Sequence, residues 1–187
     1  MKRLFDIVAV LVASPVWLPL LLLTALVVWL VEGRPLFFVQ ERAGLGERPF
    51  RMVKFRTMKL GDAPDAARLT RFGRFLRAAS LDELPELFHV LSGKMSLVGP
   101  RPLPVAYLPR YTAEQRRRHA VRPGITGWAQ VHGRNETSWE ERFARDVWYV
   151  DHASFALDFK ILLMTIGTVF AARGVSQTGQ ATMEEFK

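Results

Sequence analysis

The first 33 residues combine a long uncharged stretch with charged flanks. Residues 7–31 carry no charge over 25 positions, and about 20 consecutive apolar residues are enough to span a bilayer as a helix. Lys2, Arg3 and Asp6 precede this stretch, and Glu32 and Arg34 flank its other end. The pattern predicts a membrane-embedded unit at residues 1–33 and a globular unit at residues 34–187.

Two common explanations fit this stretch poorly. A secretory signal peptide has an apolar core of about 7–15 residues, whereas this stretch is longer and has Asp6 in its basic start. A straight spanning helix fits the length, but Pro15 and Pro19 each remove a backbone donor and clash with the carbonyl four residues earlier. It would also put most of the basic residues on the face opposite Lys2 and Arg3, against the positive-inside tendency.

We therefore favour a helix that is broken at Ser14-Pro15 and enters and leaves the membrane by the same face. At about 1.5 Å per residue, residues 4–14 form an arm of about 16 Å and residues 15–31 a return of about 25 Å. Backbone groups at a break inside a bilayer need internal hydrogen-bond partners. The Ser14 hydroxyl is placed to bond a carbonyl that the break leaves free.

Beyond residue 33 the pattern predicts a small β element and several helices. Residues 35–40 and 50–55 flank a turn-rich loop, as in a hairpin. The predicted helices are residues 66–79, 84–91, 112–120, 138–150 and 155–172. The first is basic and amphipathic, which fits equally a helix on an anionic bilayer surface and a core-packing helix with a solvated arginine face. The last is apolar with two charges, which suits an interfacial or core helix. The expected fold is α+β and mostly helical: a monotopic membrane protein with a re-entrant broken helix, interfacial amphipathic helices and a small β element.

Composition narrows the class of protein and its partners. The chain has 187 residues, of which 49% are hydrophobic and none is cysteine. This excludes disorder, disulfides, a thiolate metal site and a cysteine nucleophile. The net charge is +8, and the charges up to Glu32 cancel, so the excess lies in the globular unit. Such a surface attracts anions: nucleic acid, acidic lipid or a phosphorylated substrate.

The candidate chemistry concentrates at Ser80-Leu-Asp-Glu83, which has two interpretations. Ser80 with Glu83 three residues later is the pattern of a capping box, and Asp82 would then complement the dipole in the first helical turn. Pro85 disturbs a regular helix at this point, so the turn is expected to be irregular or the helix to begin later. On the second interpretation, Asp82 is an ionised nucleophile at an anion-binding helix end.

The surroundings of the acidic pair favour a phosphate-bearing substrate. Two adjacent carboxylates can hold Mg²⁺, which prefers one or two carboxylates together with phosphate oxygens. Arginines within reach would bind a diphosphate bidentately. The basic candidates are Lys54, Arg56, Arg74, Arg77, Arg101, Arg122 and Arg134.

Several long stretches resemble a known family. They are KRLFDIVAVLVASP, FVQERAGLGERPFRMVKFRTM, RFGRFLRAASLDELPELFHVLSGKMSLVGPRPL and RHAVRPGITGWAQVHGRN. In this order they resemble the small bacterial sugar transferases, monotopic phosphoglycosyl transferases that load a sugar 1-phosphate onto undecaprenyl phosphate. The resemblance runs from about Lys2 to Ser176, nearly the whole chain.

The resemblance implies a UDP-sugar donor, an undecaprenyl phosphate acceptor and Mg²⁺ at the cytoplasmic face of the bacterial inner membrane, in glycoconjugate assembly. It implies Asp82 as the nucleophile that forms a covalent phosphosugar with release of UMP, and Glu83 as its metal-associated partner. It also matches Ser14-Pro15 to the family's helix break and Pro100-Arg101-Pro102 to its nucleotide-side motif. The remaining matches to substrate-site positions are Lys54, Arg56, Arg77, Arg122, Arg134, Asp146 and Asp158. His132 and Ala43 depart from the usual residues and bear at most on sugar choice.

Two hypotheses from other classes remain open. One is a non-enzymatic, membrane-anchored basic protein that binds acidic lipid, and the other is a membrane-tethered nucleic-acid binder with aromatic and basic side chains on one face. Neither explains an acidic pair at a helix start in a basic setting, so we expect the lipid bilayer and the two substrates as partners, and no nucleic acid. The sequence predicts neither the sugar nor the oligomeric state.

Overall fold

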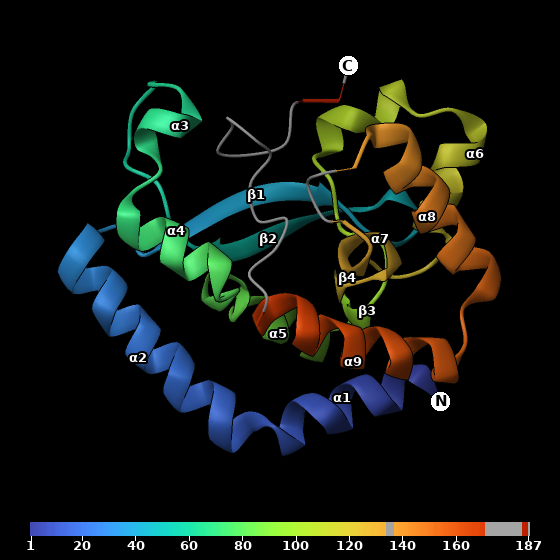
Figure 1. Cartoon of the computed structure of the whole chain (residues 1–187), viewed down its shortest axis with the longest axis horizontal. Coiled ribbons are helices and arrows are strands. Elements are labelled where there is room, and N and C mark those ends of the chain that lie inside the picture. Colours follow the sequence, from blue (N-terminus) through green and yellow to red (C-terminus); the bar gives the residue numbers. More distant parts are fainter. Residues whose placement is uncertain (134–136, 171–184, 187) are drawn as a thin grey trace.

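The computed structural model describes residues 1–133, 137–170 and 185–186. Helices dominate this part of the chain, and two small sheets accompany them. In Figure 1 the two N-terminal helices lie along the bottom of the view, and the β-hairpin and the remaining helices lie above them. The mostly helical α+β character expected from the sequence is confirmed.

The N-terminal segment is a bent helix pair. Helix α1 covers Lys2–Val12 and α2 covers Ser14–Glu32, and the chain turns at Ala13. Ser14 Oγ donates a hydrogen bond of 2.7 Å to the carbonyl of Leu11, as the sequence suggested. The bend thus lies next to the predicted Ser14-Pro15 break, while Pro19 is accommodated inside α2.

The outer surface of this pair is apolar. Within the described residues, α2 is the one helix long and apolar enough to cross a membrane. Many of its large side chains point outward, and so do those of the first helix. The exposed set includes Leu4, Val8, Leu11, Val12, Val16, Leu22, Leu23, Leu26, Trp29, Leu30 and Val31. Water does not stabilise such a surface, so this finding is consistent with membrane association.

Both ends of the bent pair are fastened to the globular part. At the start, Arg3 donates to the carbonyls of Val90 and Leu91, and Asp6 accepts a 2.8 Å bond from the Ser96 hydroxyl. At the far end, Thr70 donates a 2.6 Å hydrogen bond to the Glu32 carboxylate. The two ends therefore rest on one body, and the apolar bend projects away from it (Figure 1).

The predicted hairpin is present. Strand β1 (Phe37–Ala43) pairs antiparallel with β2 (Pro49–Phe55), with Val39 opposite Val53. A second pair was not predicted: β3 (Ser96–Val98) lies parallel to β4 (Gly124–Thr126). Three-residue strands are too short to show an alternating pattern. Gly124 permits the close approach of the two chain segments, since a Cβ there would lie only 2.1 Å from the Gly99 nitrogen.

The predicted helix at residues 66–79 is in fact two helices. Helix α3 covers Asp65–Arg68 and α4 covers Arg71–Ala78. Thr70 separates them because its hydroxyl caps α4, accepting a 2.8 Å bond from the Gly73 amide. The apolar spacing continues across this cap, which is why the pattern indicated a single helix.

The other helices follow the predictions with shifted bounds. Helix α5 covers Glu86–Leu91 and begins only after Pro85. A capping box starts α6 (Ala113–Arg116), which continues into a 3₁₀ turn at Arg117–Ala120. A short α7 (Trp128–Val131) was not predicted, and α8 (Trp139–His152) and α9 (Phe155–Phe170) follow it.

The hydrophobic core consists of several clusters, two of which join the bent pair to the globular part. One contains Val10, Trp17, Val90 and Met95, and the other contains Val28, Phe55 and Leu76. Helix α9 lies beside α1 in Figure 1, and the rings of Phe5 and Phe155 meet edge to face at 5.0 Å. Packing thus determines where the bent pair sits relative to β2, α4 and α5, the elements that carry the acidic pair's neighbours.

Candidate active site

Asp82 and Glu83 lie in an irregular turn and not at a capped helix start. The residues Leu81–Glu83 form a 3₁₀ turn between α4 and α5. Ser80 has a φ of 55° and makes no capping bond, so the capping-box interpretation is wrong. An N-cap residue needs extended backbone angles, which this left-handed conformation does not provide. A non-glycine residue in this region costs on the order of 1–3 kcal/mol, and such strain clusters at functional sites.

Glu83 is held by two cations on the same oxygen. Its Oε1 atom lies 2.7 Å from Lys54 Nζ and 2.5 Å from Arg101 Nη2. Burial acts to raise the pKa of Glu83, but Arg101 and Lys54 outweigh it and hold that pKa well below its usual range. In return, the Glu83 carboxylate raises the pKa of Arg101. Glu83 is therefore ionised at neutral pH. Its charge-assisted hydrogen bonds to Lys54 and Arg101 are stronger than the backbone hydrogen bond of a capping box would be.

Asp82 differs from its neighbour. Its side chain is buried, and burial, together with the charge of Glu83, raises its pKa to about 6. Lys54, Arg77 and Arg101 act in the opposite direction and keep the shift from being larger. At neutral pH this carboxylate is mostly ionised and more basic than an ordinary aspartate. Such a group is suited to nucleophilic attack on a phosphorus atom.

Arg77 reaches the same turn from α4. Its Nε donates a 3.0 Å bond to the Thr57 hydroxyl, and burial lowers the pKa of Arg77 while Asp82 raises it. The contact is possible because α4 packs tightly on the chain at Thr57: a Cβ on Gly73 would lie 1.9 Å from the Thr57 carbonyl oxygen. Gly73 thereby brings the Arg77 side chain close to the acidic pair.

Glu86 is a third acid that the sequence did not single out. It is almost fully buried at the start of α5, and its Oε1 lies 3.0 Å from Lys54 Nζ. Burial raises the pKa of Glu86, and Lys54 limits the rise. Lys54 is consequently fixed between Glu83 and Glu86. The signal available in the sequence was an acidic residue three positions after Glu83, on the same side of a helical turn.

The strand that carries Lys54 is also tied to α5. The backbone amide of Val53 donates a 3.1 Å bond to Nε2 of His89. Burial lowers the pKa of His89, so its ring stays neutral and able to accept. Because Val53 precedes Lys54 in β2 and His89 lies on the same helix as Glu86, this bond helps to hold Lys54 next to Glu86.

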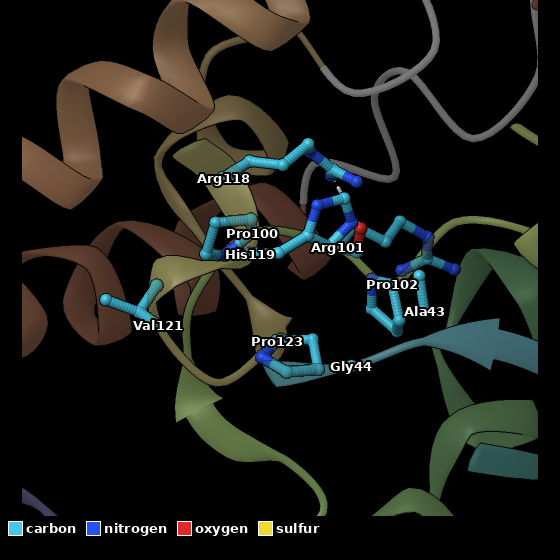
Figure 2. Close-up of a pocket in the computed structure, with 9 residues that line it drawn as sticks. All are labelled: Ala43, Gly44, Pro100, Arg101, Pro102, Arg118, His119, Val121 and Pro123. Carbon is cyan, nitrogen blue, oxygen red and sulfur yellow. Dashed lines mark hydrogen bonds between the residues drawn. The ribbon is translucent and has the colours of Figure 1, made fainter. Parts of the chain in front are cut away.

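The loop that carries Arg101 is held by a buried ion pair. Arg118 Nη2 lies 2.7 Å from Asp146 Oδ2 and also donates to the Arg101 carbonyl at 2.7 Å, the bond drawn in Figure 2. Both charged side chains are almost fully buried. Asp146, expected to bind substrate, thus acts on Arg101 through Arg118. Figure 2 also shows that the residues of this loop line a small hollow together with Ala43, Gly44 and His119.

The remaining predicted residues lie elsewhere. Arg56 bonds the backbone carbonyls of Pro35, Met58, Glu32 and Gly33, and so closes the end of α2. Arg122 is exposed and donates to the Gly93 carbonyl at 3.0 Å. Asp158 pairs with Lys2 and accepts from the Tyr149 hydroxyl at 2.6 Å. Arg134 lies outside the described residues. Of the predicted basic residues, the structure brings Lys54, Arg77 and Arg101 to the acidic pair, and the contacts described for Arg56 and Arg122 are structural.

The acidic pair fits a Mg²⁺ site in which the protein supplies only two carboxylates. Within the part of the chain that the structure describes, no group of three or more histidine, cysteine or acidic side chains is arranged to hold a metal. Mg²⁺ usually takes only one or two protein carboxylates and completes its shell with water and phosphate oxygens. Asp82 offers the oxygens of a carboxylate whose pKa is raised by burial and then by the charge of Glu83, and Glu83 has one oxygen beyond the one bound by Lys54 and Arg101.

Known proteins resemble this chain over most of its length. The family model described as bacterial sugar transferase matches residues 1–172. The uncharacterized sugar transferase EpsL of Bacillus subtilis is 51% identical over all of this chain and 95% of its own length. A UDP-glucose:undecaprenyl-phosphate glucose-1-phosphate transferase of Caulobacter vibrioides is 46% identical over 88% of this chain and 68% of its own length.

A third relative differs in its named sugar. A UDP-N-acetylgalactosamine-undecaprenyl-phosphate N-acetylgalactosaminephosphotransferase of Aeromonas hydrophila is 39% identical over 92% of this chain, which covers 44% of that longer protein. The match to the family model runs through the bent helix pair, the acidic pair and the arginine-bearing loop alike. On this evidence the chain belongs to the bacterial sugar transferase family.

Proposed function

We propose that this protein transfers a sugar 1-phosphate from a UDP-sugar to undecaprenyl phosphate through a covalent intermediate on Asp82. The observation that carries the proposal is the buried Asp82 carboxylate with a pKa of about 6, next to Lys54, Arg77 and Arg101. Cations around a nucleophilic carboxylate offset the repulsion between it and a diphosphate. The relatives named as UDP-sugar:undecaprenyl-phosphate transferases support the substrate classes.

In the first half-reaction, an Asp82 oxygen forms a bond to the β-phosphorus of the UDP-sugar. The bond from that phosphorus to the bridging oxygen breaks, and UMP leaves with the electron pair. In the second half-reaction, a phosphate oxygen of undecaprenyl phosphate attacks the phosphorus of the aspartyl phosphosugar. The Asp82 carboxylate is released, and the product is undecaprenyl diphosphate sugar. Two steps allow the two large substrates to use the site in turn.

The other residues bind and orient. Arg77 and Arg101 lie where they would contact the phosphoryl oxygens, and Glu86 and Glu83 keep Lys54 directed at the same point. Mg²⁺ bound by Asp82 and Glu83 would neutralise phosphate charge at the reacting phosphorus. The positioning of Arg101 rests on Arg118 and Asp146.

We also propose that residues 1–33 are re-entrant and that the catalytic part faces the cytoplasm at the inner membrane. Both ends of the bent pair contact the same globular part, which supports entry and exit by one face. Undecaprenyl phosphate has its head at the membrane surface and UDP-sugars are soluble. An enzyme that joins them needs its site at that surface, and the basic globular unit attracts both anions.

The test is release of UMP from a panel of UDP-sugars by the purified protein without any acceptor. We expect about one UMP per enzyme and the mass of one phosphosugar added to the protein. Asp82→Asn should give neither, while Asp62→Asn, which changes an exposed aspartate, should behave as wild type. UMP release that requires undecaprenyl phosphate would favour direct transfer. If wild type released no UMP under either condition, the lipid-binding and nucleic-acid-binding hypotheses would be favoured.

A further inference from the structure

Arg42, near the end of β1, is a partly buried cation without a carboxylate partner among the described residues. Its Nη1 donates a 3.2 Å bond to the Pro102 carbonyl, and its Nη2 donates a 2.6 Å bond to Gln40 Oε1. Its Nε is buried and has no hydrogen-bond partner. A buried guanidinium donor without an acceptor is costly, and most such groups are paired with protein, water or ligand.

A second guanidinium belongs to Arg101, the residue before Pro102, whose carbonyl Arg42 binds. Burial lowers the pKa of Arg42 to about 10, and the positive charge of Arg101 is the next cause. Glu86 acts in the opposite direction but forms no ion pair with Arg42 in the described part of the chain. Two arginines close together in a partly dry setting repel each other unless an anion lies between them. The bond from Arg42 to the Pro102 carbonyl keeps Arg42 beside the loop that carries Arg101.

The positions of Arg101 and Arg42 relative to Asp82 indicate which anion would bind. Arg101 binds Glu83, the residue after Asp82, at 2.5 Å. Arg42 donates to the carbonyl of Pro102, the residue after Arg101. Arg101 therefore connects the acidic turn with the end of β1 that carries Arg42. A diphosphate with one phosphorus at Asp82 would direct the neighbouring phosphorus toward Arg101 and Arg42.

The residues next to Arg42 on that side are small and border a shallow hollow. Ala43 and Gly44 line the hollow in Figure 2 together with Arg101 and Pro102, and Arg42 immediately precedes them in the chain. A Cβ at Gly44 would lie 3.0 Å from the Arg48 carbonyl oxygen, so this turn stays narrow. Small side chains next to two guanidiniums are typical of a place where a phosphate group approaches the backbone.

We propose that Arg42, paired with Arg101, binds the phosphate that the leaving nucleoside monophosphate retains. This inference rests on the proposed function and assigns a role to Arg42, which the sequence analysis named only as part of the stretch FVQERAGLGERPFRMVKFRTM. Arg42 would bind the α-phosphate of the donor and stabilise the charge that develops on it as UMP departs. Arginine suits this role because two of its N–H groups can bind one phosphate.

The test is equilibrium binding of UMP and of uridine to the full-length protein in nanodiscs. Wild type should bind UMP at least about tenfold more tightly than uridine, since a hydrogen bond to a charged group contributes about 1.5–3 kcal/mol. Arg42→Ala should lose at least about tenfold in UMP affinity and keep its uridine affinity. Arg42→Lys should be intermediate, because it retains the charge without the fork. Arg117→Ala, which removes an exposed arginine in surface ion pairs, should match wild type.

Three results would overturn the inference: UMP binding of Arg42→Ala equal to that of Arg117→Ala, an equal loss of uridine binding, or a wild type that does not prefer UMP. If Arg42→Ala does not fold, the same criteria apply to Arg42→Lys, with a loss of at least about threefold expected. The proposed function fails separately, if wild type forms no phosphosugar adduct and releases no UMP. Adduct formation by wild type together with unchanged UMP binding in the Arg42 variants would reject this inference alone.

Discussion

Arg101 Nη2 lies 2.5 Å from Glu83 Oε1, and this contact joins two parts of the chain that are separately fastened. Glu83 belongs to the turn between α4 and α5, whereas Arg101 belongs to the loop after β3. The Arg101 carbonyl is held in turn by Arg118. The ion pair is therefore the point at which the acidic turn and the proline-rich loop are aligned with each other.

Loss of this ion pair should reduce catalysis strongly. Arg101→Ala leaves Glu83 with one cation and, on the proposed mechanism, removes a hydrogen-bond donor to the reacting phosphate. Removing a donor of this kind costs about 10²–10³-fold in rate, so we expect a drop of that size in kcat/KM for the UDP-sugar. Arg101→Lys should recover part of it. The measurement is initial-rate UMP release, with Arg117→Ala as the surface control. A drop below about threefold in Arg101→Ala would show that the pair is dispensable.

What the sequence predicted and what it missed have a common explanation. The helix break and the hairpin follow from local patterns, which a sequence displays directly. The role of Asp82-Glu83 stays a prediction. The ion pairs join distant positions: Lys54 contacts Glu83 across 29 residues, and Arg118 contacts Asp146 across 28. No local pattern indicates that Asp146 would meet Arg118, or that Arg56 would be used on backbone carbonyls. The capping box was a local interpretation of Ser80 and Glu83 that the distant partners of Glu83 overrode.

The rate of transfer should depend on pH through Asp82. Attack requires the ionised carboxylate, and burial and Glu83 raise the pKa of Asp82 to about 6. We expect kcat/KM to fall about tenfold per pH unit below about pH 6 and to level off above it, because kcat/KM reports ionisations of the free enzyme. The measurement is kcat/KM from pH 4.5 to 8.5, with stability checked at each pH. A flat profile between pH 5 and 7 would contradict the assignment.

The same carboxylate should lower the stability of the folded protein at neutral pH. The pKa of Asp82 is raised on folding, so the native state binds more protons than the unfolded state, and its contribution to stability is lost as pH rises from about 4 to about 6. Asp82→Asn removes this effect and should raise stability at pH 7.5 by roughly 1–3 kcal/mol. On the scale of about 2–4 °C per kcal/mol, thermal unfolding should shift upward by several degrees. At pH 4 the two proteins should unfold at similar temperatures, and a lower Tm for the variant at both pH values would refute the argument.

Asp158 should prove to be a structural residue. It is buried, pairs with Lys2 at the start of α1 and accepts from the Tyr149 hydroxyl. Asp158→Asn keeps the shape but loses the charge, and we expect a loss of about 1–3 kcal/mol in stability. The KM for the UDP-sugar should stay within about twofold of wild type when rates are referred to folded protein. A double-mutant cycle with Lys2→Met checks the pairing, since coupled residues give non-additive losses. A raised KM with unchanged stability would instead favour the substrate-binding role that the family resemblance implied.

The membrane arrangement can be tested with single cysteines, since the native chain has none. We expect cysteines introduced after Met1, at Arg34 and at Arg117 to react with an impermeant reagent from the same side of the membrane, because both ends of the bent pair contact the globular part. Arg34 and Arg117 are exposed, so the substitutions disturb little packing. A cysteine at Leu23, on the exposed apolar surface of α2, should not react with the reagent in intact vesicles. It should react once the protein is denatured. Labelling of the Met1 and Arg34 positions from opposite sides would mean that α1 and α2 together span the bilayer, and the re-entrant arrangement would have to be abandoned.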